Sequence, residues 1–450
     1  MALEDITHVE RTTPEGATVL VLNTASAIDP EAQAMLAALH SRSIGGIRSH
    51  LKVLAEKGAD NFMSKFYVGY GHKSIGDLGS VTVFIEHVSM LAAKALQDLR
   101  LYNGQEASTR YIDFATQPFI DPIATEASRT LLESLRAFYL RGLTTLSSHL
   151  TALYPPTGHE NPVVYEKALR ARAFDIMRSF LPAGASTNLA WHGPLRVFGD
   201  RLITLRHHPL IEVRHIADAL ESALSAAHPH SFSTTRYSAT EVYAESVAQQ
   251  TTYLRSFSET PFRVTRDTFD RALLLQHREL LSSRPQRVEL PRILDEAGEL
   301  QCEYLLDFGS FRDIQRHRAV VQRMPLLTVA YGFEEWYLDS LPDALRDEAR
   351  TFLRDYEHSL QSLYRDPTLL EYYIPMGYRT LNRLTGTLPG LTYLAELRSG
   401  STVHPTLRVF AQTLGRELET RLLDTGYVIH LDRSETRFDT RRGTHDIVMQ

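Results

Sequence analysis

VTVFIEHVSMLAAKALQDLRLYNGQEASTRY, Val81 to Tyr111, is the stretch that decides the fold. Its first eight residues, 81–88, mix β-branched and aromatic side chains, which is typical of a strand. A helical stripe of apolar residues follows, formed by Val88, Leu91, Ala92, Ala95, Leu96 and Leu99. The run NGQEASTRY, 103–111, comes where this buried helix ends, and its polarity indicates a loop. The predicted order is therefore strand, buried helix and polar loop.

The loop carries a carboxylate, a hydroxyl and a guanidinium on alternate residues, Glu106, Ser108 and Arg110. A serine hydroxyl, free backbone amides and an arginine fork can hold a phosphate. Glu106 or Gln105 can hydrogen-bond the edge of a base or a sugar. Polar turns after helices are common, so composition alone favours an ordinary turn over a nucleotide-binding loop.

The latter part of the chain repeats this order loosely. CEYLLDFGSFRDIQRHR, 302–318, predicts a strand followed by a helix that ends in basic residues. MRSFLPAGAST, 177–187, and YIPMGYRTLNR, 373–383, both contain a Pro-x-Gly turn. Each turn precedes a predicted helix, the first over residues 194–206 and the second ending in YLAELR.

The spacing within these segments supports a degenerate repeat. Pro182 precedes Arg206 by 24 positions, and Pro375 precedes Arg398 by 23. Repeated spacing of this kind indicates two related halves, which the polar segment 249–265 would join.

The chain is predicted to be α+β, with two domains that each have a central twisted sheet flanked by helices. The first domain spans 1–255 and the second 256–435. Residues 436–450 are charged and poor in apolar side chains, so a mobile tail is expected there.

Length and charge narrow the class of protein. The 450 residues carry a net charge of −6 and no long basic run, which weighs against a nucleic-acid binder. Cys302 is the sole cysteine, so no intrachain disulfide can form. The N-terminus lacks the apolar core of a signal peptide, and no apolar run approaches the roughly 20 residues of a membrane span. A soluble, cytoplasmic protein is expected.

The sequence contains no nucleophile elbow, HExxH pair, Walker loop or GxGxxG motif, and no metal site is predicted. If the chain is an enzyme, a bound cofactor is expected to carry the chemistry. Arginines near turns, Arg178, Arg196 and Arg206, could together hold an anion. The Arg-His-Arg run at 316–318 closes a helix, where cations are usually favoured by the helix dipole and face solvent.

Taken in chain order, five segments resemble the flavin-dependent thymidylate synthases over residues 60–220: GHKSIGDL, VFIEHVS, RLYNGQEASTRY, MRSFLP and the Leu-Arg at Arg206. The family shows Gly-His-x-Ser, a strand, a helix ending Arg-His-Arg, a Ser/Asn/Glu/Ser/Arg loop, Arg-x-x-Leu-Pro and a helix ending Leu-Arg. This resemblance implies two thymidylate synthase-like domains in tandem. It also implies the conversion of dUMP to dTMP with FAD as cofactor, 5,10-methylenetetrahydrofolate and NADPH as co-substrates, and no protein nucleophile.

The resemblance also implies roles for individual residues. The expected dUMP contacts are Gln105, Glu106, Ser108, Arg110, Arg178 and Arg206. The expected flavin contacts are His72, Ser74, Arg196, Asp200, His317 and Arg318. Arg316 is expected near the pyrimidine, where it would favour negative charge on the base as C5 becomes nucleophilic.

Departures from the family pattern fall differently in the two halves. In the first half, Asp98-Leu99-Arg100 stands in place of Arg-His-Arg, Asn103 replaces the first motif serine, and Leu78 stands where a histidine is usual. The second half keeps Arg-His-Arg at 316–318, but the loop VQRMPLLT that follows lacks the Ser-x-Arg pattern of the nucleotide-binding loop.

Each half therefore keeps what the other has lost. Since the family builds its sites between subunits of a homotetramer, we expect sites that pair the first half's loop with the second half's Arg-His-Arg. A homodimer would then form a pseudo-tetramer of four domains. Two alternatives stay open: a nucleotide- or flavin-binding relative that has lost turnover, and a C5-methylase of another uridine nucleotide.

Overall fold

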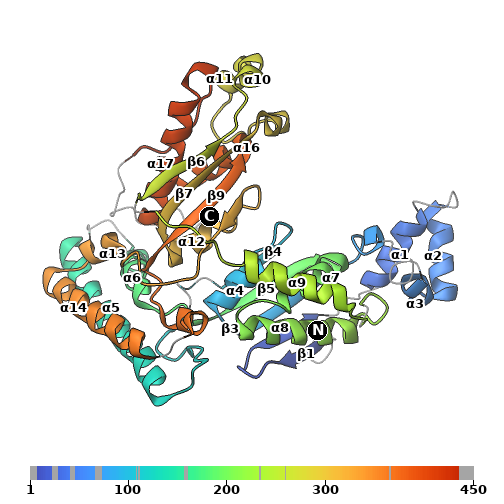
Figure 1. Cartoon of the computed structure of the whole chain (residues 1–450), viewed down its shortest axis with the longest axis horizontal. Coiled ribbons are helices and arrows are strands. Elements are labelled where there is room, and N and C mark those ends of the chain that lie inside the picture. Colours follow the sequence, from blue (N-terminus) through green and yellow to red (C-terminus); the bar gives the residue numbers. More distant parts are fainter. Residues whose placement is uncertain are drawn as a thin grey trace. The chain divides into compact units, whose positions relative to one another are not determined.

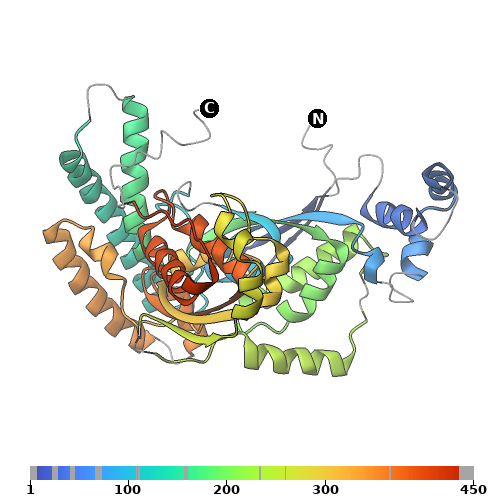
Figure 2. The same cartoon turned by 90° about the horizontal axis from the view of Figure 1, so that it is seen from above.

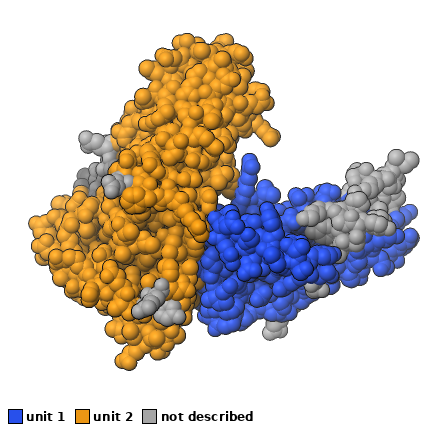
Figure 3. Space-filling view, viewed as in Figure 1, with its two compact units in different colours: residues 1–108, 185–252 blue, residues 109–184, 253–450 orange. Residues whose placement is uncertain are grey.

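The computed structural model describes residues 8–22, 29–40, 46–65, 73–107, 109, 112–156, 161–232, 235–258, 260–363 and 366–434. The chain folds into two compact units (Figure 3). Unit 1 contains residues 1–108 and 185–252, and unit 2 contains residues 109–184 and 253–450. Residues 109–184 thus leave the first half of the sequence and join the second half in unit 2.

Unit 1 is built on an antiparallel sheet with the strand order β1-β2-β3-β5-β4. Its strands are β1 (His8–Thr12), β2 (Thr18–Leu22), β3 (Ser80–Ser89), β4 (Asn103–Glu106) and β5 (Ser186–Pro194). Its α-helices are α1 (Pro30–His40), α2 (Gly46–Lys57), α3 (Asp60–Phe62), α4 (Met90–Gln97), α7 (Leu195–Leu205), α8 (Ile211–Ala227) and α9 (Ser238–Thr251), with the 3-10 helix η3 (Lys73–Ile75). Helix α8 packs on β1 and β2, whereas α1, α2 and α3 gather beyond one end of the sheet (Figure 1).

Unit 2 is built on a second antiparallel sheet, with the strand order β6-β7-β9-β8. Its strands are β6 (Phe262–Asp267), β7 (Glu299–Asp307), β8 (Val321–Arg323) and β9 (Arg379–Thr387). Around the sheet lie α10 (Arg271–Gln276), α11 (Arg278–Ser283), η6 (Arg292–Ala297), α12 (Phe308–Ile314), α13 (Glu335–Asp339), α16 (Leu388–Arg398), α17 (Pro405–Arg421) and η8 (Leu423–Thr425).

A separate helical layer completes unit 2. It consists of α5 (Glu126–Leu153), α6 (Pro162–Met177), η5 (Arg178–Phe180), α14 (Asp343–Leu363), α15 (Pro367–Leu370) and η7 (Glu371–Tyr373). Helix α5 comes from the first half of the sequence and α14 from the second, and they lie side by side (Figures 1 and 2). The rings of Phe138 and Phe352 stack with centroids 4.5 Å apart, and Arg141 forms an ion pair with Glu348. Apolar burial at this seam holds segments of both halves in one unit.

Several elements of the second half follow the same order as elements of the first half. A shift of 193 positions carries η5 onto η7, β5 onto β9, and α7 onto α16 without a change of length. A shift of 194 carries α8 onto α17, and the two sheets share the order β2-β3-β5-β4 and β6-β7-β9-β8. The mixed fold with two sheets predicted from the sequence is confirmed.

The two Pro-x-Gly turns pair with each other inside unit 2. The amide of Ala183 donates to Ile374 O over 2.8 Å, and the amide of Met376, 193 positions after Ala183, donates to Leu181 O over 2.9 Å. Gly184 N to Tyr372 O and Gly377 N to Ser179 O, at 2.7 and 2.8 Å, form a second such pair. The exchange is reciprocal, so the equivalent turns meet about a local pseudo-twofold axis.

The predicted strand 81–88 and the helix after it are confirmed as β3 and α4, the predicted helix 194–206 as α7, and the strand of 302–318 as β7. The helix of 302–318 is present as α12 but ends at Ile314, so the prediction that 316–318 close a helix is wrong. The predicted loop is wrong in part, because 103–106 form the edge strand β4. Gly104 permits this pairing: a Cβ there would lie 2.1 Å from the carbonyl oxygen of Ala190 on β5. The expected tail, 436–450, lies outside the described residues.

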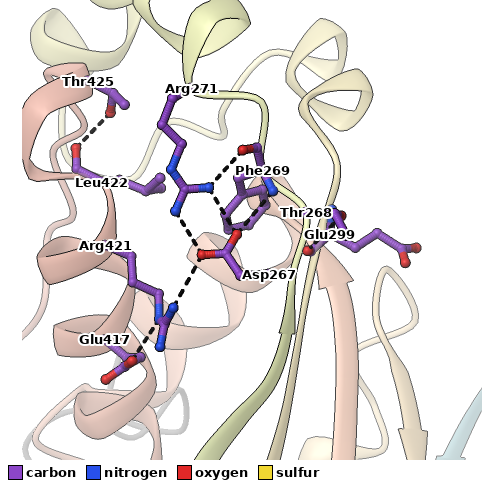
Figure 4. Close-up of polar contacts among 9 residues, drawn as sticks. All are labelled: Asp267, Thr268, Phe269, Arg271, Glu299, Glu417, Arg421, Leu422 and Thr425. Atoms are coloured by element: carbon purple, nitrogen blue, oxygen red, sulfur yellow. Dashed lines mark hydrogen bonds and ion pairs between the residues drawn. The ribbon is translucent and has the colours of Figure 1, made fainter.

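An ion cluster fastens the end of β6 to the end of α17 (Figure 4). Asp267 accepts from Arg271 over 2.7 Å and lies 3.3 Å from Arg421. The hydrogen bond from Arg271 is the main cause that lowers the pKa of Asp267 to about 2. Because this folded-state pKa is depressed, the stability it adds is present above the ordinary carboxyl pKa and is lost as the pH falls toward 2.

We expect Asp267→Asn to lower the free energy of unfolding by about 1 kcal/mol at pH 7, since its arginine partners are partly exposed. The difference from the unsubstituted protein should shrink between pH 4 and pH 2 in thermal unfolding scans. Glu299→Gln, which breaks the exposed pair with Arg266, is the matched control and should change stability little. A pH-independent effect of Asp267→Asn would contradict the ionic account.

Candidate functional site

The Arg-His-Arg run forms the turn between α12 and β8 in unit 2. The side-chain amide of Gln322 pins this turn by donating to Ile314 O over 3.0 Å and to His317 O over 2.8 Å. Arg316 and Arg318 are exposed, whereas His317 is only 7% exposed. The turn therefore presents two guanidiniums beside one buried imidazole.

Arg398, the last residue of α16, fixes the tautomer of His317. Its Nε donates to His317 Nε2 over 2.8 Å, while its Nη2 donates to Asp313 O over 2.9 Å. A guanidinium can only donate, so Nε2 of the imidazole is unprotonated and Nδ1 carries the proton. Burial, followed by the charge of Arg398, lowers the pKa of His317 to about 3, so the ring is neutral at pH 7.

A buried carboxylate caps the N-terminus of α12. Asp307 accepts from the Ser310 amide over 2.9 Å, from the Tyr337 hydroxyl over 2.9 Å and from the Thr406 hydroxyl over 2.7 Å. It is fully buried, and burial raises its pKa despite these bonds. Unit 1 has the same device with the groups exchanged: Ser89 caps α4 and donates over 2.6 Å to Glu212 on α8.

Arg178, predicted to bind the nucleotide, lies in η5 beside this cap. Its Nε is buried and has no hydrogen-bond partner among the described residues. The pKa of the guanidinium is raised: burial works against the charge, and nearby acidic groups outweigh burial, namely Tyr337, Asp175, Asp313 and Asp307. No ion pair within 4 Å joins Arg178 to a described carboxylate. The Arg178 guanidinium is therefore a buried cation among acidic groups, and its Nε is an unused donor. A further acceptor oxygen would satisfy this donor.

The equivalent positions of the other repeat do not reproduce these groups. A shift of 193 places Glu371 opposite Arg178, and Glu371 is buried and accepts from Leu327 N over 2.9 Å. By the shifts of 218 and 193 that align the helices, Leu99 stands opposite His317, and Leu205 opposite Arg398. The spacing in the sequence matches Arg206 with Arg398. The aligned helices instead place Arg206 opposite Ser399.

In unit 1, the predicted nucleotide contacts Gln105 and Glu106 lie on the edge strand β4. Gln97, at the end of α4, donates to the Glu106 carboxylate over 2.8 Å. Ser108 and Arg110 lie outside the described residues. Gln105 and Glu106, the described part of the predicted nucleotide-binding segment, are thus positioned by an edge strand and not by a free loop.

Two of the predicted flavin contacts of unit 1 belong to neighbouring segments. Arg196, on α7, forms an ion pair of 2.6 Å with Asp77, which belongs to the same GHKSIGD motif as Ser74. Ser74 is exposed in η3, and Asp200 is exposed on α7. His72 lies outside the described residues.

Arg206 follows the last residue of α7, and both of its Nη atoms face carboxylates. Nη2 lies 2.8 Å from Glu241 on α9, and Nη1 lies 3.2 Å from Glu221 on α8. The side chain is 9% exposed. The predicted phosphate ligand is therefore covered by groups of unit 1 itself.

Unit 2 contains both Arg178 from the first half and 316–318 from the second half, and Asp313 on α12 lies near Arg178. Unit 1 holds Ser74, Gln105, Glu106, Arg196, Asp200 and Arg206. Sequence reasoning missed Arg398 as a partner of His317, and it missed the buried groups around Asp307. The order of the elements could have indicated the cap, since a shift of 218 aligns Ser89 with Asp307 and a shift of 194 aligns Glu212 with Thr406.

Arg398→Leu, which copies Leu205 of the other repeat, is expected to raise the pKa of His317. The substitution removes a positive neighbour and a donor to Nε2, although burial still opposes protonation. The imidazole resonances followed by NMR against pH would show the shift. Arg398→Lys keeps the charge and should shift the pKa less, whereas an unchanged titration in Arg398→Leu would contradict the coupling.

Several known proteins are similar to this chain in sequence. The model of the family described as thymidylate synthase complementing protein matches residues 23–230. A UPF0159 protein of Chlamydia pneumoniae is 27% identical over 420 residues, covering 81% of this chain and 78% of that protein. A UPF0159 protein of Thermoplasma acidophilum is 24% identical over 472 residues, covering 86% and 94%. These similarities extend well past residue 230, so they include both halves.

Two solved structures are similar at lower identity. Thymidylate synthase X from Helicobacter pylori, solved with FAD and dUMP, is 19% identical with a TM-score of 0.29, covering 48% of this chain and 96% of that one. The UMP/dUMP methylase PolB from Streptomyces cacaoi, bound with 5-Br dUMP, is 16% identical with a TM-score of 0.31, covering 49% and 93%. Among the described residues, no helix has the length and apolar composition of a membrane span.

The family match confirms the resemblance predicted from the motifs, and with it the expectation of a thymidylate synthase-like enzyme. Residues 23–230 of the chain are thus similar to the thymidylate synthase complementing protein family.

Proposed function

We propose that the chain methylates dUMP to dTMP with FAD as cofactor and with 5,10-methylenetetrahydrofolate and NADPH as co-substrates. We further propose that the two halves are diverged copies that both contribute to the site. One observation carries the proposal: Arg178 of the first half and the Arg-His-Arg turn of the second half share unit 2, and Asp313 on α12 lies close enough to raise the pKa of Arg178.

The residues of this region suit an anionic nucleotide and a flavin. The buried Nε of Arg178 lacks an acceptor among the described residues, and a phosphate oxygen would supply one. His317 is held as the Nδ1–H tautomer, which leaves it a hydrogen-bond donor for a flavin heteroatom. When bound, FAD would supply the redox chemistry that turns the transferred one-carbon unit into a methyl group.

The chain's own residues would then act by binding and positioning. Arg178 would hold the monoester phosphate, and Arg316 would favour negative charge on the pyrimidine as C5 becomes nucleophilic. Gln105 and Glu106 would contact the nucleotide, as the family resemblance implies. Holding both reactants in a fixed geometry can supply much of the rate acceleration without a protein nucleophile.

Divergence of the repeats leads us to propose one nucleotide site of this kind per chain. At the position equivalent to Arg178, the Glu371 carboxylate would repel a phosphate, and Leu99 has no hydrogen-bonding group where the second half has His317. Calorimetric titration of the flavin-loaded protein with dUMP should therefore saturate at one nucleotide per chain. A stoichiometry of two would contradict the loss of the second site.

His317→Ala is expected to purify with at least tenfold less flavin than the unsubstituted protein, since it removes the fixed donor. Absorbance in the flavin bands measures this directly. Tyr393→Phe, which alters the ring 5.9 Å from His317 and keeps the Arg398 contact, is the matched control. Full flavin content in His317→Ala would exclude the Arg-His-Arg turn from the cofactor site.

Turnover itself separates the proposal from its alternatives. The loaded enzyme with methylenetetrahydrofolate and NADPH should form dTMP from dUMP, and UMP should be tested in parallel. Product from UMP alone would indicate a methylase of another uridine nucleotide. Flavin and dUMP binding without product from either nucleotide would indicate a relative that has lost turnover.

A further inference from the structure

The predicted phosphate ligand Arg206 is engaged by a carboxylate from the last helix of unit 1. Glu241 on α9 reaches Arg206 Nη2 with Oε1 and His207 Nε2 with Oε2, each over 2.8 Å. One carboxylate thus bridges two adjacent side chains at the end of α7. Two oxygens shared between a guanidinium and an imidazole are the arrangement that a bound phosphate also makes.

The second carboxylate at Arg206, Glu221, has a further ion-pair partner. Glu221 lies on α8, whose apolar face is buried, and it is also bound by Arg236 over 2.5 Å. Glu221 can therefore stay paired when Arg206 changes partners. Glu241 is the exchangeable ligand, because its position depends on how firmly α9 is held.

Helix α9 has few apolar contacts to hold it. Only two of its side chains are buried, Ala244 and Ala248, and both are small. Val242 and Tyr243 are 67% and 73% exposed, and Tyr237 provides no side-chain cap for the helix. Figure 2 shows α9, in yellow-green, as a separate rod at the margin of unit 1. Burial of two alanines contributes little, so the bonds of Glu241 are its main attachment.

The charges favour this attachment while the site contains no other anion. Hydrogen bonding from Arg206, opposed by burial and aided by His207, lowers the pKa of Glu241, so its carboxylate is ionised at neutral pH. A nucleotide phosphate carries more charge and a third acceptor oxygen, so it competes well for the same donors. Displacement of Glu241 would release α9, because the helix has little else to hold it.

We propose that α9 is an autoinhibitory latch, in which Glu241 occupies the place of the nucleotide's anionic group at Arg206 and the nucleotide displaces it. The latch rests on the proposed function, and it adds Arg206, a dUMP contact that the family resemblance implies, as a further ligand of the same nucleotide. It adds a regulatory contact made by the last helix of unit 1. The described residues of the second half that follow α17 contain no counterpart of α9.

Calorimetry with dUMP on the full-length, flavin-loaded protein tests the latch. Glu241→Gln removes the competing charge and should bind dUMP about 10-fold more tightly than the unsubstituted protein. Glu245→Gln, one turn further along the same helix on an exposed residue, is the matched control and should bind unchanged. Glu241→Ala should match or exceed the gain of Glu241→Gln.

Hydrogen exchange of the 238–251 amides is the second measurement. Addition of dUMP to the unsubstituted protein should speed their exchange, and Glu241→Gln should speed it without nucleotide. If the unsubstituted protein binds dUMP while Glu241→Gln binds no better and α9 exchange stays constant, the latch is wrong and the proposed function stands. If neither protein binds dUMP, the proposed function fails, and the latch fails with it.

Discussion

Arg178→Ala is expected to weaken dUMP binding by about 100-fold while the protein keeps its flavin. The guanidinium is a positive charge that the first half contributes near Asp307 and Asp313, and its Nε has no acceptor among the described residues. Alanine would remove a buried cation from a surround of carboxylates, and the remaining negative field of Asp175 and Asp307 would then oppose a phosphate. Calorimetric titration of the flavin-loaded variant measures the loss.

Two further variants separate binding from folding. Arg178→Lys keeps the charge but not the planar fork, so it should recover part of the affinity. Arg170→Ala changes an exposed arginine of α6 and should leave affinity unchanged. Unchanged dUMP affinity in Arg178→Ala, with normal flavin content, would exclude Arg178 from the nucleotide site.

Local periodicity was enough to predict the elements that carry the site. The strand 81–88 mixes β-branched and aromatic residues, and the apolar stripe after it has helical spacing, so β3 and α4 follow from short-range chemistry. The same holds for β7 and α12. The family resemblance rested on motifs at the ends of these elements, of which the described residues include Gln105, Glu106 and 316–318.

Contacts between distant segments could not be predicted in the same way. Residues 103–106 have the polarity of a turn, and only pairing with β5, permitted by Gly104, makes them a strand. Residues 109–184 pack with α14 through Phe138 and Phe352, which are 214 positions apart. The bond from Arg398 to His317 depends on a one-position difference between helix ends, below the accuracy of boundaries read from sequence.

The exchanged caps show how the two repeats keep one structure with different residues. Ser89 with Glu212 and Asp307 with Thr406 each place a carboxylate and a hydroxyl at the start of a buried helix. Position by position these pairs look unrelated, since an acid stands opposite a hydroxyl in each case. In both units a carboxylate and a hydroxyl fill the hydrogen-bonding groups at this position, although the residues that supply them differ.

The cap of α12 gives the largest expected effect on stability. Asp307→Ala is expected to lower the free energy of unfolding by about 4 kcal/mol, because it removes a helix cap and leaves the hydroxyls of Tyr337 and Thr406 buried without their acceptor. Chemical unfolding followed by Trp336 fluorescence, in a Trp191→Phe background, reports on unit 2 where this cap lies.

Asp307→Asn should behave in the opposite way. Burial raises the pKa of Asp307, so ionisation costs stability that is regained as the pH falls through the folded-state pKa. Asparagine keeps an acceptor for Ser310 and Tyr337 without the buried charge, and Thr406 can accept from its amide. We therefore expect Asp307→Asn to be at least as stable as the unsubstituted protein at pH 7, with an advantage that shrinks as the pH falls. A loss as large as that of Asp307→Ala would show that the charge itself holds the cap together, and would make its attraction for Arg178 the dominant interaction.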